Sequence, residues 1–110
     1  MVILDELRVE MIGYRDEMKE LADVLDIENA KKEHEELQQE IAKEGFWDDL
    51  ENSQKVLQRS KNLENKIAKF NKLNERLEDA ITLIELSIEE DDESSVDEIK
   101  SEMTEFKKIL

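Results

Sequence analysis

The sequence of 110 residues contains no cysteine, no proline and only two glycines, Gly13 and Gly45. Without cysteine the chain can form no disulfide, thiol nucleophile or zinc–thiolate site. Proline and glycine make most tight turns, so a chain nearly free of both has few of them. No apolar run approaches the ~18 residues of a membrane-spanning helix, and the acidic start is unlike a signal peptide. We therefore predict a cytoplasmic protein, with residues 1–110 forming a single domain.

The charge is strongly unbalanced, because 31 acidic residues face 16 basic ones and leave a formal net charge of −15. Charged residues make up 43% of the chain and apolar residues 38%. Such a composition occurs in disordered proteins, which bury too little apolar surface to fold. It also occurs in long amphipathic helices, whose apolar residues recur at spacings of three and four. The order of the apolar residues decides between the two.

Four segments show this helical spacing, which predicts an all-α protein of four helices. The stripes begin at Leu4, Ile27, Val56 and Val96, and no helix-breaking residue occurs in the third segment up to Ile88. From about Leu50 that helix would extend roughly 58 Å at about 1.5 Å per residue. We expect an antiparallel, coiled-coil-like bundle built on this long central helix, with Phe70 in its core. Ser60 and Asn74 interrupt the third stripe, as polar residues do where helix register is fixed.

The helix boundaries follow from local signals. The second stripe is out of phase with the first, so we expect a break near Leu25–Ile27, with Asp26 as N-cap. The acidic run 89–93 opposes the dipole of the long helix, so the chain should turn there. Ser95 and Glu98 then fit a capping box that opens the last helix. Since that helix keeps its spacing to Leu110, we expect a longer protein of which this chain is the N-terminal part.

The connection between the second and third helices carries a compact cluster of special residues. Gly45 fits a residue that closes one helix, and Asp48 or Asp49 can cap the next one. Phe46 and Trp47 stand between them, and two large rings are seldom left in water. We expect both rings to fill the junction where the helices diverge.

Catalytic and metal-binding motifs are lacking. His34 is the only histidine, and we expect it at a helix–helix contact. The residue three positions before it is Lys31, so the Glu-x-x-His motif of di-iron bundles is missing. Neither His-Glu-x-x-His nor a glycine-rich phosphate loop is present. We therefore predict no enzymatic activity, no cofactor and no metal.

One stretch is basic within this acidic chain. Lys55–Arg76 holds seven basic residues and two acidic ones, Glu64 and Glu75, which leaves a net charge of +5. The stretch could contact RNA phosphate, or it could pair with the acidic helices beside it, each exposed pair contributing about 0–1 kcal/mol. We favour pairing, because the overall charge of −15 disfavours strong binding of free nucleic acid.

Several segments, in order, resemble the N-terminal domain of the bacterial peptide chain release factor 2 family. A helix ending in Ala-Lys-Glu-Gly precedes Phe46, Trp47, Asp48 and Asp49, and a long helix follows. Segments 25–33 and 77–86 resemble the second helix and the end of the long helix, and 89–93 resembles the acidic turn after it. The likeness covers essentially the whole chain. Leu50 is a departure, since the family commonly has proline there, a favoured first helical residue.

The resemblance implies a factor that recognises the stop codons UGA and UAA and promotes hydrolysis of peptidyl-tRNA. The family uses a Ser-Pro-Phe tripeptide and a Gly-Gly-Gln motif for these steps, and neither occurs in this sequence. The N-terminal domain is an accessory module near the stalk base of the large ribosomal subunit and the GTPase release factor. The resemblance also implies that this domain is a monomer. We expect the acidic turn to form a partner-contact surface, which comprises Glu89, Glu90, Asp91, Asp92 and Glu93.

The alternative interpretation is a stand-alone coiled-coil or spectrin-like structural protein that dimerises through the same apolar stripes. A tight dimer in solution would favour it.

Overall fold

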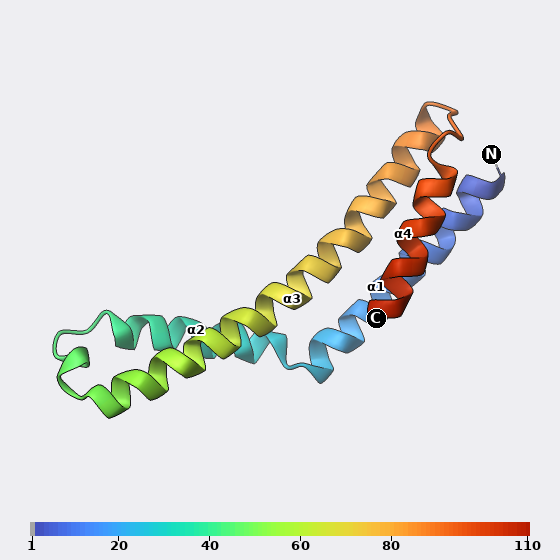
Figure 1. Ribbon diagram of the computed structural model, residues 1–110. Coiled ribbons are helices and arrows are strands. Elements are labelled where there is room, and N and C mark those ends of the chain that lie inside the picture. Colours follow the sequence, from blue (N-terminus) through green and yellow to red (C-terminus); the bar gives the residue numbers. More distant parts are fainter. Residues whose placement is uncertain (1) are drawn as a thin grey trace. The chain divides into compact units, whose positions relative to one another are not determined.

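The computed structural model describes residues 2–110 and is built from helices (Figure 1). They are α1 (Val2–Val24), α2 (Ile27–Ile41), a short 3-10 turn η1 (Phe46–Asp48), α3 (Leu50–Glu89) and α4 (Val96–Ile109). No strand occurs within residues 2–110. The prediction of an all-α chain with four helices, the longest of them central, is confirmed. None of the helices in the described part is long and apolar enough to cross a membrane.

The contacts divide the chain into two compact units. One unit, called here the three-helix unit, comprises Met1–Leu21 and Asn71–Leu110. The other, called the hairpin unit, comprises Ala22–Phe70. The long helix α3 contributes its first half to the hairpin unit and its second half to the three-helix unit.

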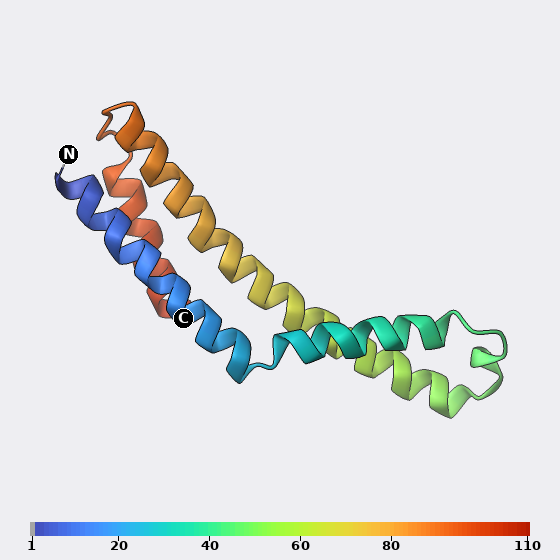
Figure 2. The same ribbon diagram turned by 180° about the vertical axis from the view of Figure 1, so that it is seen from behind.

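In the three-helix unit, α1, the second half of α3 and α4 lie side by side (Figures 1 and 2). Each helix turns its apolar stripe inward, as the spacing predicts. Phe106 of α4 is fully buried, and its ring lies 5.4 Å from the ring of Tyr14 on α1. The other fully buried apolar side chains of this core are Leu4, Met11, Leu77, Ile84, Ile81 and Ile99.

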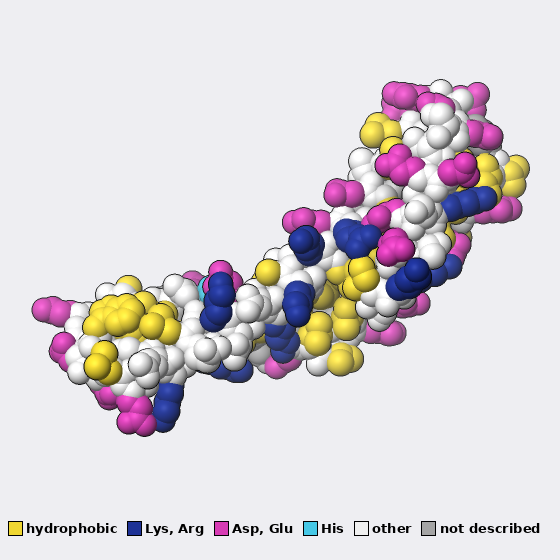
Figure 3. All heavy atoms as spheres, viewed as in Figure 1, with side chains coloured by type: hydrophobic (Ala, Val, Ile, Leu, Met, Phe, Trp, Pro, Cys, Tyr) yellow, Lys and Arg dark blue, Asp and Glu magenta, His cyan; other side chains and the backbone are white. Residues whose placement is uncertain are grey.

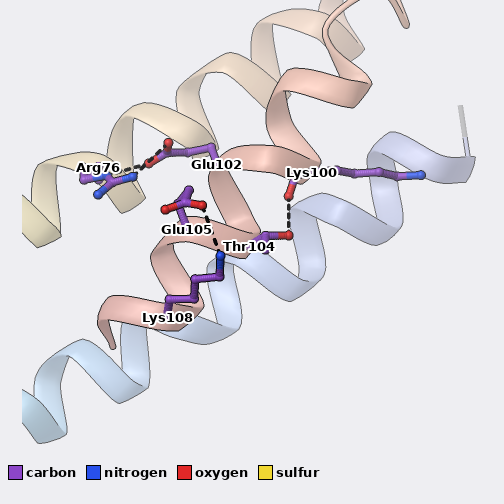
Figure 4. A network of polar contacts seen from close by, with 6 residues as sticks. All are labelled: Arg76, Lys100, Glu102, Thr104, Glu105 and Lys108. Carbon is purple, nitrogen blue, oxygen red and sulfur yellow. Dashed lines mark hydrogen bonds and ion pairs between the residues drawn. The ribbon is translucent and has the colours of Figure 1, made fainter.

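Ion pairs join the edges of all three helix pairs in this unit. The pairs are Arg15–Glu78 at 2.7 Å, Arg76–Glu102 at 2.8 Å and Lys107–Glu10 at 2.8 Å. Both arginines bind their carboxylates through two nitrogens, and Figure 4 shows Arg76 reaching Glu102 from α3 to α4. Exposed pairs contribute about 0–1 kcal/mol each. Bidentate geometry also fixes the positions of the partners, so the two arginine pairs help to set helix register.

In the hairpin unit, α2 runs antiparallel to the first half of α3 (Figures 1 and 2). Its core contains Ile27, Ala30, Phe46, Val56 and Leu63. A polar contact accompanies them: Ser60 is buried, and its hydroxyl accepts a hydrogen bond of 2.8 Å from Gln38 Nε2 on α2. A polar residue inside an apolar stripe can therefore join two helices at one register, as predicted for Ser60.

Phe70 departs from the prediction. The third apolar stripe is otherwise buried as expected, with Leu63, Leu77 and Ile81 among its most buried members. Phe70, however, is only partly buried. Helical spacing gives the side of the helix on which a residue lies, but it does not tell how completely neighbouring helices cover that position.

Two predicted N-caps have the right position but the wrong chemistry. α1 ends and α2 begins around Asp26, which has φ 55° and whose carboxylate makes no capping bond. That carboxylate instead accepts hydrogen bonds of 2.9 and 3.1 Å from Asn29 Nδ2. Ser95 precedes α4 without a side-chain capping bond, so the predicted capping box with Glu98 is wrong. In both places the backbone carbonyl accepts the first helical hydrogen bond, from Ala30 and Ile99 respectively.

Candidate functional site

The connection at the end of the hairpin unit is an ordered turn held by backbone geometry. Gly45 has φ 83°, in the region that favours glycine. It does not close α2 as predicted, because α2 ends at Ile41 and is capped by Ala42. Gly45 instead opens η1, with its carbonyl accepting a hydrogen bond of 3.1 Å from the Asp48 N–H. The prediction that Gly45 closes α2 is therefore wrong, although Gly45 does adopt the left-handed conformation that such a closing residue would have.

Asp49 caps the long helix. Its Oδ1 accepts a hydrogen bond of 3.1 Å from the N–H of Asn52, the third residue of α3. Of the two aspartates offered by the sequence, Asp49 is thus the N-cap, and its charge suits the positive end of the helix. Ser53 adds a second tie, because its buried hydroxyl lies 2.8 Å from the carbonyl oxygen of Phe46 and 2.7 Å from that of Asp49. These bonds fix the turn onto the first turn of α3.

The two aromatic rings of this turn have different environments. Phe46 is 7% exposed and belongs to the core, as predicted. Trp47 is 58% exposed, so the expectation that it also fills the junction is wrong. The rings meet edge to face, with centroids 5.1 Å apart. A three-residue turn directs consecutive side chains differently, so one ring can enter the core while the next stays outside. Leu50, the first residue of α3, is 70% exposed.

The end of the hairpin is acidic as well as partly apolar. A shallow depression between the end of α2 and the start of α3 is lined by residues that include Glu40, Glu44, Phe46 and Asp49. Lys43 is the one basic residue on that lining. The residues Phe46, Trp47, Asp48 and Asp49 therefore form a firmly held turn with one exposed ring and a negative rim. We call this set the hairpin tip.

The acidic turn after α3 belongs to the three-helix unit and ends the helix in a defined way. Asp91 has φ 52°. The Asp92 N–H donates to the carbonyl of Ser87 at 2.9 Å, and the Asp91 N–H donates to that of Ile88 at 3.1 Å. This pair of bonds is the Schellman motif, in which the left-handed position is usually glycine. An aspartate occupies it here, and aspartate tolerates this conformation better than most residues.

Asp92 organises the exit from the same turn. Its Oδ1 accepts a hydrogen bond of 2.9 Å from the Ser94 N–H, and this bond lowers the pKa of the Asp92 carboxyl. The carbonyl of Glu93 then accepts the N–H of Val96, the first residue of α4. Asp91 and Asp92 therefore shape the turn, whereas Glu89, Glu90 and Glu93 take part in no side-chain hydrogen bond or ion pair among the described residues.

All five carboxylates of the acidic turn, residues 89–93, are exposed. In Figure 3 magenta side chains gather around the connection between α3 and α4. The turn thus presents a concentrated negative surface on a fixed backbone. It lies in the three-helix unit, whereas the hairpin tip lies in the hairpin unit.

His34 lies partly exposed on α2, with its Nε2 3.4 Å from Gln38 Nε2 on the same helix. Gln38 in turn contacts Ser60 on α3. His34 is therefore next to a helix–helix contact. Within residues 2–110, no group of three or more histidine, aspartate or glutamate side chains is arranged to hold a metal ion.

The basic stretch divides into paired arginines and mostly unpaired lysines. Arg59 binds Glu33 of α2 with both carboxylate oxygens engaged, and Arg76 binds Glu102 of α4. Each pair raises the pKa of the arginine through the hydrogen bond to its carboxylate. The preferred interpretation, pairing with acidic neighbours, is correct for both arginines. Of the lysines, Lys55 alone has a partner within the described residues, Glu51 at 3.5 Å.

Sequence reasoning missed Ser53 and Ser94, which hold the two surfaces in shape. Serine inside a helix usually carries no signal, because its hydroxyl often bonds the carbonyl four residues earlier. The Ser53 hydroxyl has one proton, which it shares between that carbonyl, of Asp49, and the carbonyl of Phe46. The signal for Ser94 was available: an aspartate two residues before a serine is typical of a turn in which the carboxylate accepts the backbone N–H.

Comparison with known proteins adds an independent finding. Residues 30–110 match the PCRF domain family model. A peptide chain release factor 2 from Clostridium perfringens is 39% identical over 96 residues, which cover 87% of this chain and 26% of that protein. The peptide chain release factor 2 of Saccharopolyspora erythraea is 36% identical over 87 residues, which cover 79% of this chain and 24% of that protein. The one of Staphylococcus saprophyticus is 27% identical over 107 residues, which cover 97% of this chain and 29% of that protein. The chain thus spans about a quarter of the length of these relatives. No solved structure is significantly similar to it.

Proposed function

Because the chain belongs to the PCRF domain family and resembles the N-terminal region of bacterial peptide chain release factor 2, we propose that it positions a translation termination factor on the ribosome. Its partners in this proposal are the stalk base of the large subunit and the GTPase release factor that recycles the factor. Recognition of UGA and UAA and the promotion of peptidyl-tRNA hydrolysis would belong to the longer protein. Binding, without catalysis, is the role of this domain.

The acidic turn is the observation that supports this role most directly. Its backbone is fixed by the Schellman bonds and by Asp92, while Glu89, Glu90 and Glu93 stay exposed and unpaired within the described residues. Placing like charges at the end of a helix opposes its dipole and costs stability. A gain in recognition of a basic protein surface accounts for such an arrangement, because clustered charge steers association and selects partners.

The hairpin tip supports a second contact. Trp47 is exposed, and the backbone of the turn that carries it is held in place by the hydrogen bonds of Ser53 and Asp49. Tryptophan is enriched among the residues that dominate binding energy, and a fixed side chain loses little entropy when a partner covers it. We propose that Trp47 and Leu50 give the tip an apolar anchor with acidic residues around it.

We propose that the domain acts as a monomer. The apolar stripes are largely buried inside the chain. Met11, Leu77 and Phe106 are fully buried in the three-helix unit, and Leu63 is 3% exposed in the hairpin unit. A coiled-coil dimer would need such stripes for a second chain. Sedimentation equilibrium at micromolar concentration tests this, with a monomer mass expected and a tight dimer as the contradicting result.

The acidic turn is tested by reversing the charges that have no structural role. The variant Glu89→Lys, Glu90→Lys and Glu93→Lys, made in the longer factor, keeps Asp91 and Asp92 and therefore keeps the turn. We expect slower release of the factor from ribosomes by the GTPase, with termination on stop codons in single-turnover assays largely retained.

The control is a reversal of equal size on the same unit: Asp16→Lys, Glu17→Lys and Glu20→Lys on α1. These three side chains are also exposed. The proposal predicts that the control recycles like the wild type. Equal recycling by both variants, with circular dichroism showing intact folding, would refute a role for the acidic turn.

A further inference from the structure

We propose that the outer side of the first half of α3 binds the phosphate backbone of RNA. This surface, called here the lysine face, comprises Gln54, Lys55, Gln58, Lys61, Asn62, Asn65 and Lys69. All seven residues are exposed and lie within the hairpin unit. The choice of RNA over DNA rests on the proposed role in translation.

The lysine face lies opposite the buried side of α3. At 100° per residue, its members fall within one half of the helix surface, away from Val56, Ser60 and Leu63, which pack toward α2. Glu64 is the only acidic residue between Lys55 and Lys69, and it falls outside this sector. Glu51 lies on the same side of the helix one turn before Lys55 and pairs with it, but from Gln54 to Lys69 the face itself holds no carboxylate. In Figure 3 dark blue side chains accompany the middle of α3, in contrast with the magenta of the acidic turn.

Arginine and lysine have separate roles on this part of α3. Arg59 forms an ion pair with Glu33, and this pair links α3 to α2. Lys61 and Lys69 have no partner within the described residues, and the Lys55–Glu51 pair is long, at 3.5 Å, with both side chains largely exposed. Lysine is a compact, flexible charge that suits single phosphate groups. The helix therefore uses its arginine for folding and leaves its lysines available to an anionic partner.

The neutral residues of the face indicate which anion it fits. Asparagine and glutamine contribute hydrogen bonds to phosphate and sugar in nucleic-acid complexes. Gln58 Nε2 donates to Asn62 Oδ1 at 3.0 Å, which orients the Asn62 amide so that its Nδ2 group remains a free donor among the described residues. Amide donors on the same face as the lysines can add hydrogen bonds to phosphate groups that the lysines attract.

Other anionic partners fit less well. An acidic protein surface would need apolar or aromatic anchors for affinity, and the face contains none. An anionic membrane would need a helix with a buried apolar side facing the lipid, but the apolar side of α3 packs against α2 in this unit. A nucleic-acid backbone requires charge and hydrogen bonds alone.

The test measures how salt affects ribosome binding by the longer factor. The variant Lys55→Gln, Lys61→Gln and Lys69→Gln removes three charges. Each lost phosphate contact reduces the slope of log K against log salt by about 0.7–0.9, so we expect the slope to shrink by about 2–3. Between about 50 and 200 mM salt, the wild type should accordingly lose roughly 20–40-fold more affinity than the variant. The control variant, Lys19→Gln, Lys31→Gln and Lys32→Gln, removes three exposed lysines from α1 and α2 and should leave the slope unchanged.

Hydroxyl-radical footprinting of the ribosomal RNA identifies the partner. We expect the wild type and the control to protect a stretch of RNA backbone that the lysine-face variant leaves open to cleavage. An unchanged slope would overturn the inference, and so would a smaller slope with an unchanged RNA footprint, which would indicate a protein partner. A wild-type factor that binds no ribosomes would refute the proposed function itself. A negative result in the recycling assay alone would concern only the acidic turn.

Discussion

Phe106 offers the sharpest test of the packing in the three-helix unit. Its side chain is fully buried, and its ring lies 5.4 Å from that of Tyr14. Removing a buried phenylalanine costs about 1.5–3 kcal/mol of transfer free energy, and losing the aromatic pair adds about 0.5–1.5 kcal/mol. With the cavity left behind, we expect Phe106→Ala to lower the free energy of unfolding by about 3–5 kcal/mol.

Urea denaturation followed by far-ultraviolet circular dichroism measures this loss as a lower midpoint with an unchanged slope. Phe70→Ala is the matched control, because it is the same substitution at a partly buried position. We expect a clearly smaller loss there. A loss below about 1 kcal/mol for Phe106→Ala, or equal losses for the two variants, would refute the arrangement of α1, α3 and α4 described above.

Three further predictions concern the turn, an ion pair and the helix register. Asp91→Gly should raise the free energy of unfolding by about 0.5–1 kcal/mol in urea denaturation, since φ 52° is strained for aspartate but not for glycine; a loss would contradict the left-handed turn. The hydrogen bond from Arg15 lowers the pKa of Glu78 below its usual value of 4.5. The Arg15–Glu78 pair therefore stabilises the fold above this usual value, and the stabilisation is lost as the pH falls through the lowered pKa of Glu78. The stability gap between wild type and Glu78→Gln should therefore narrow in acid, and a gap independent of pH would disprove this. Ser60→Ala should cost about 0.5–1.5 kcal/mol through its lost bond to Gln38, and no loss in thermal denaturation would show that the bond is not needed.

The helices could be predicted from the sequence because apolar spacing and breaks in phase are local signals. The phase change after Leu25 marked the end of α1, and the acidic run marked the end of α3 at Glu89. The arrangement in two units was not predictable in this way. It depends on which stripe covers which part of α3, and Phe70 shows that spacing alone leaves the degree of burial open.

The details of the candidate surfaces were predicted less well than the helices. Asp49 was correctly identified as a possible cap, but Trp47 was expected inside and is 58% exposed. The direction of a side chain on a three-residue turn depends on backbone angles that residue type does not specify. Ser95 illustrates the same limit. The residue types at Ser95 and Glu98 fit a capping box, but the Ser95 side chain makes no capping bond, and the turn is instead held by the bond from the Ser94 N–H to Asp92.

We propose that the acidic turn contacts the stalk base or the recycling GTPase. A photoreactive residue in place of Glu90, in the longer factor bound to ribosomes with the GTPase present, tests that contact directly. We predict cross-links from position 90 to a stalk-base protein or to the GTPase, and far fewer from the same residue in place of Glu17. No cross-link to either partner from position 90, or equal yields from positions 90 and 17, would contradict a contact through the acidic turn.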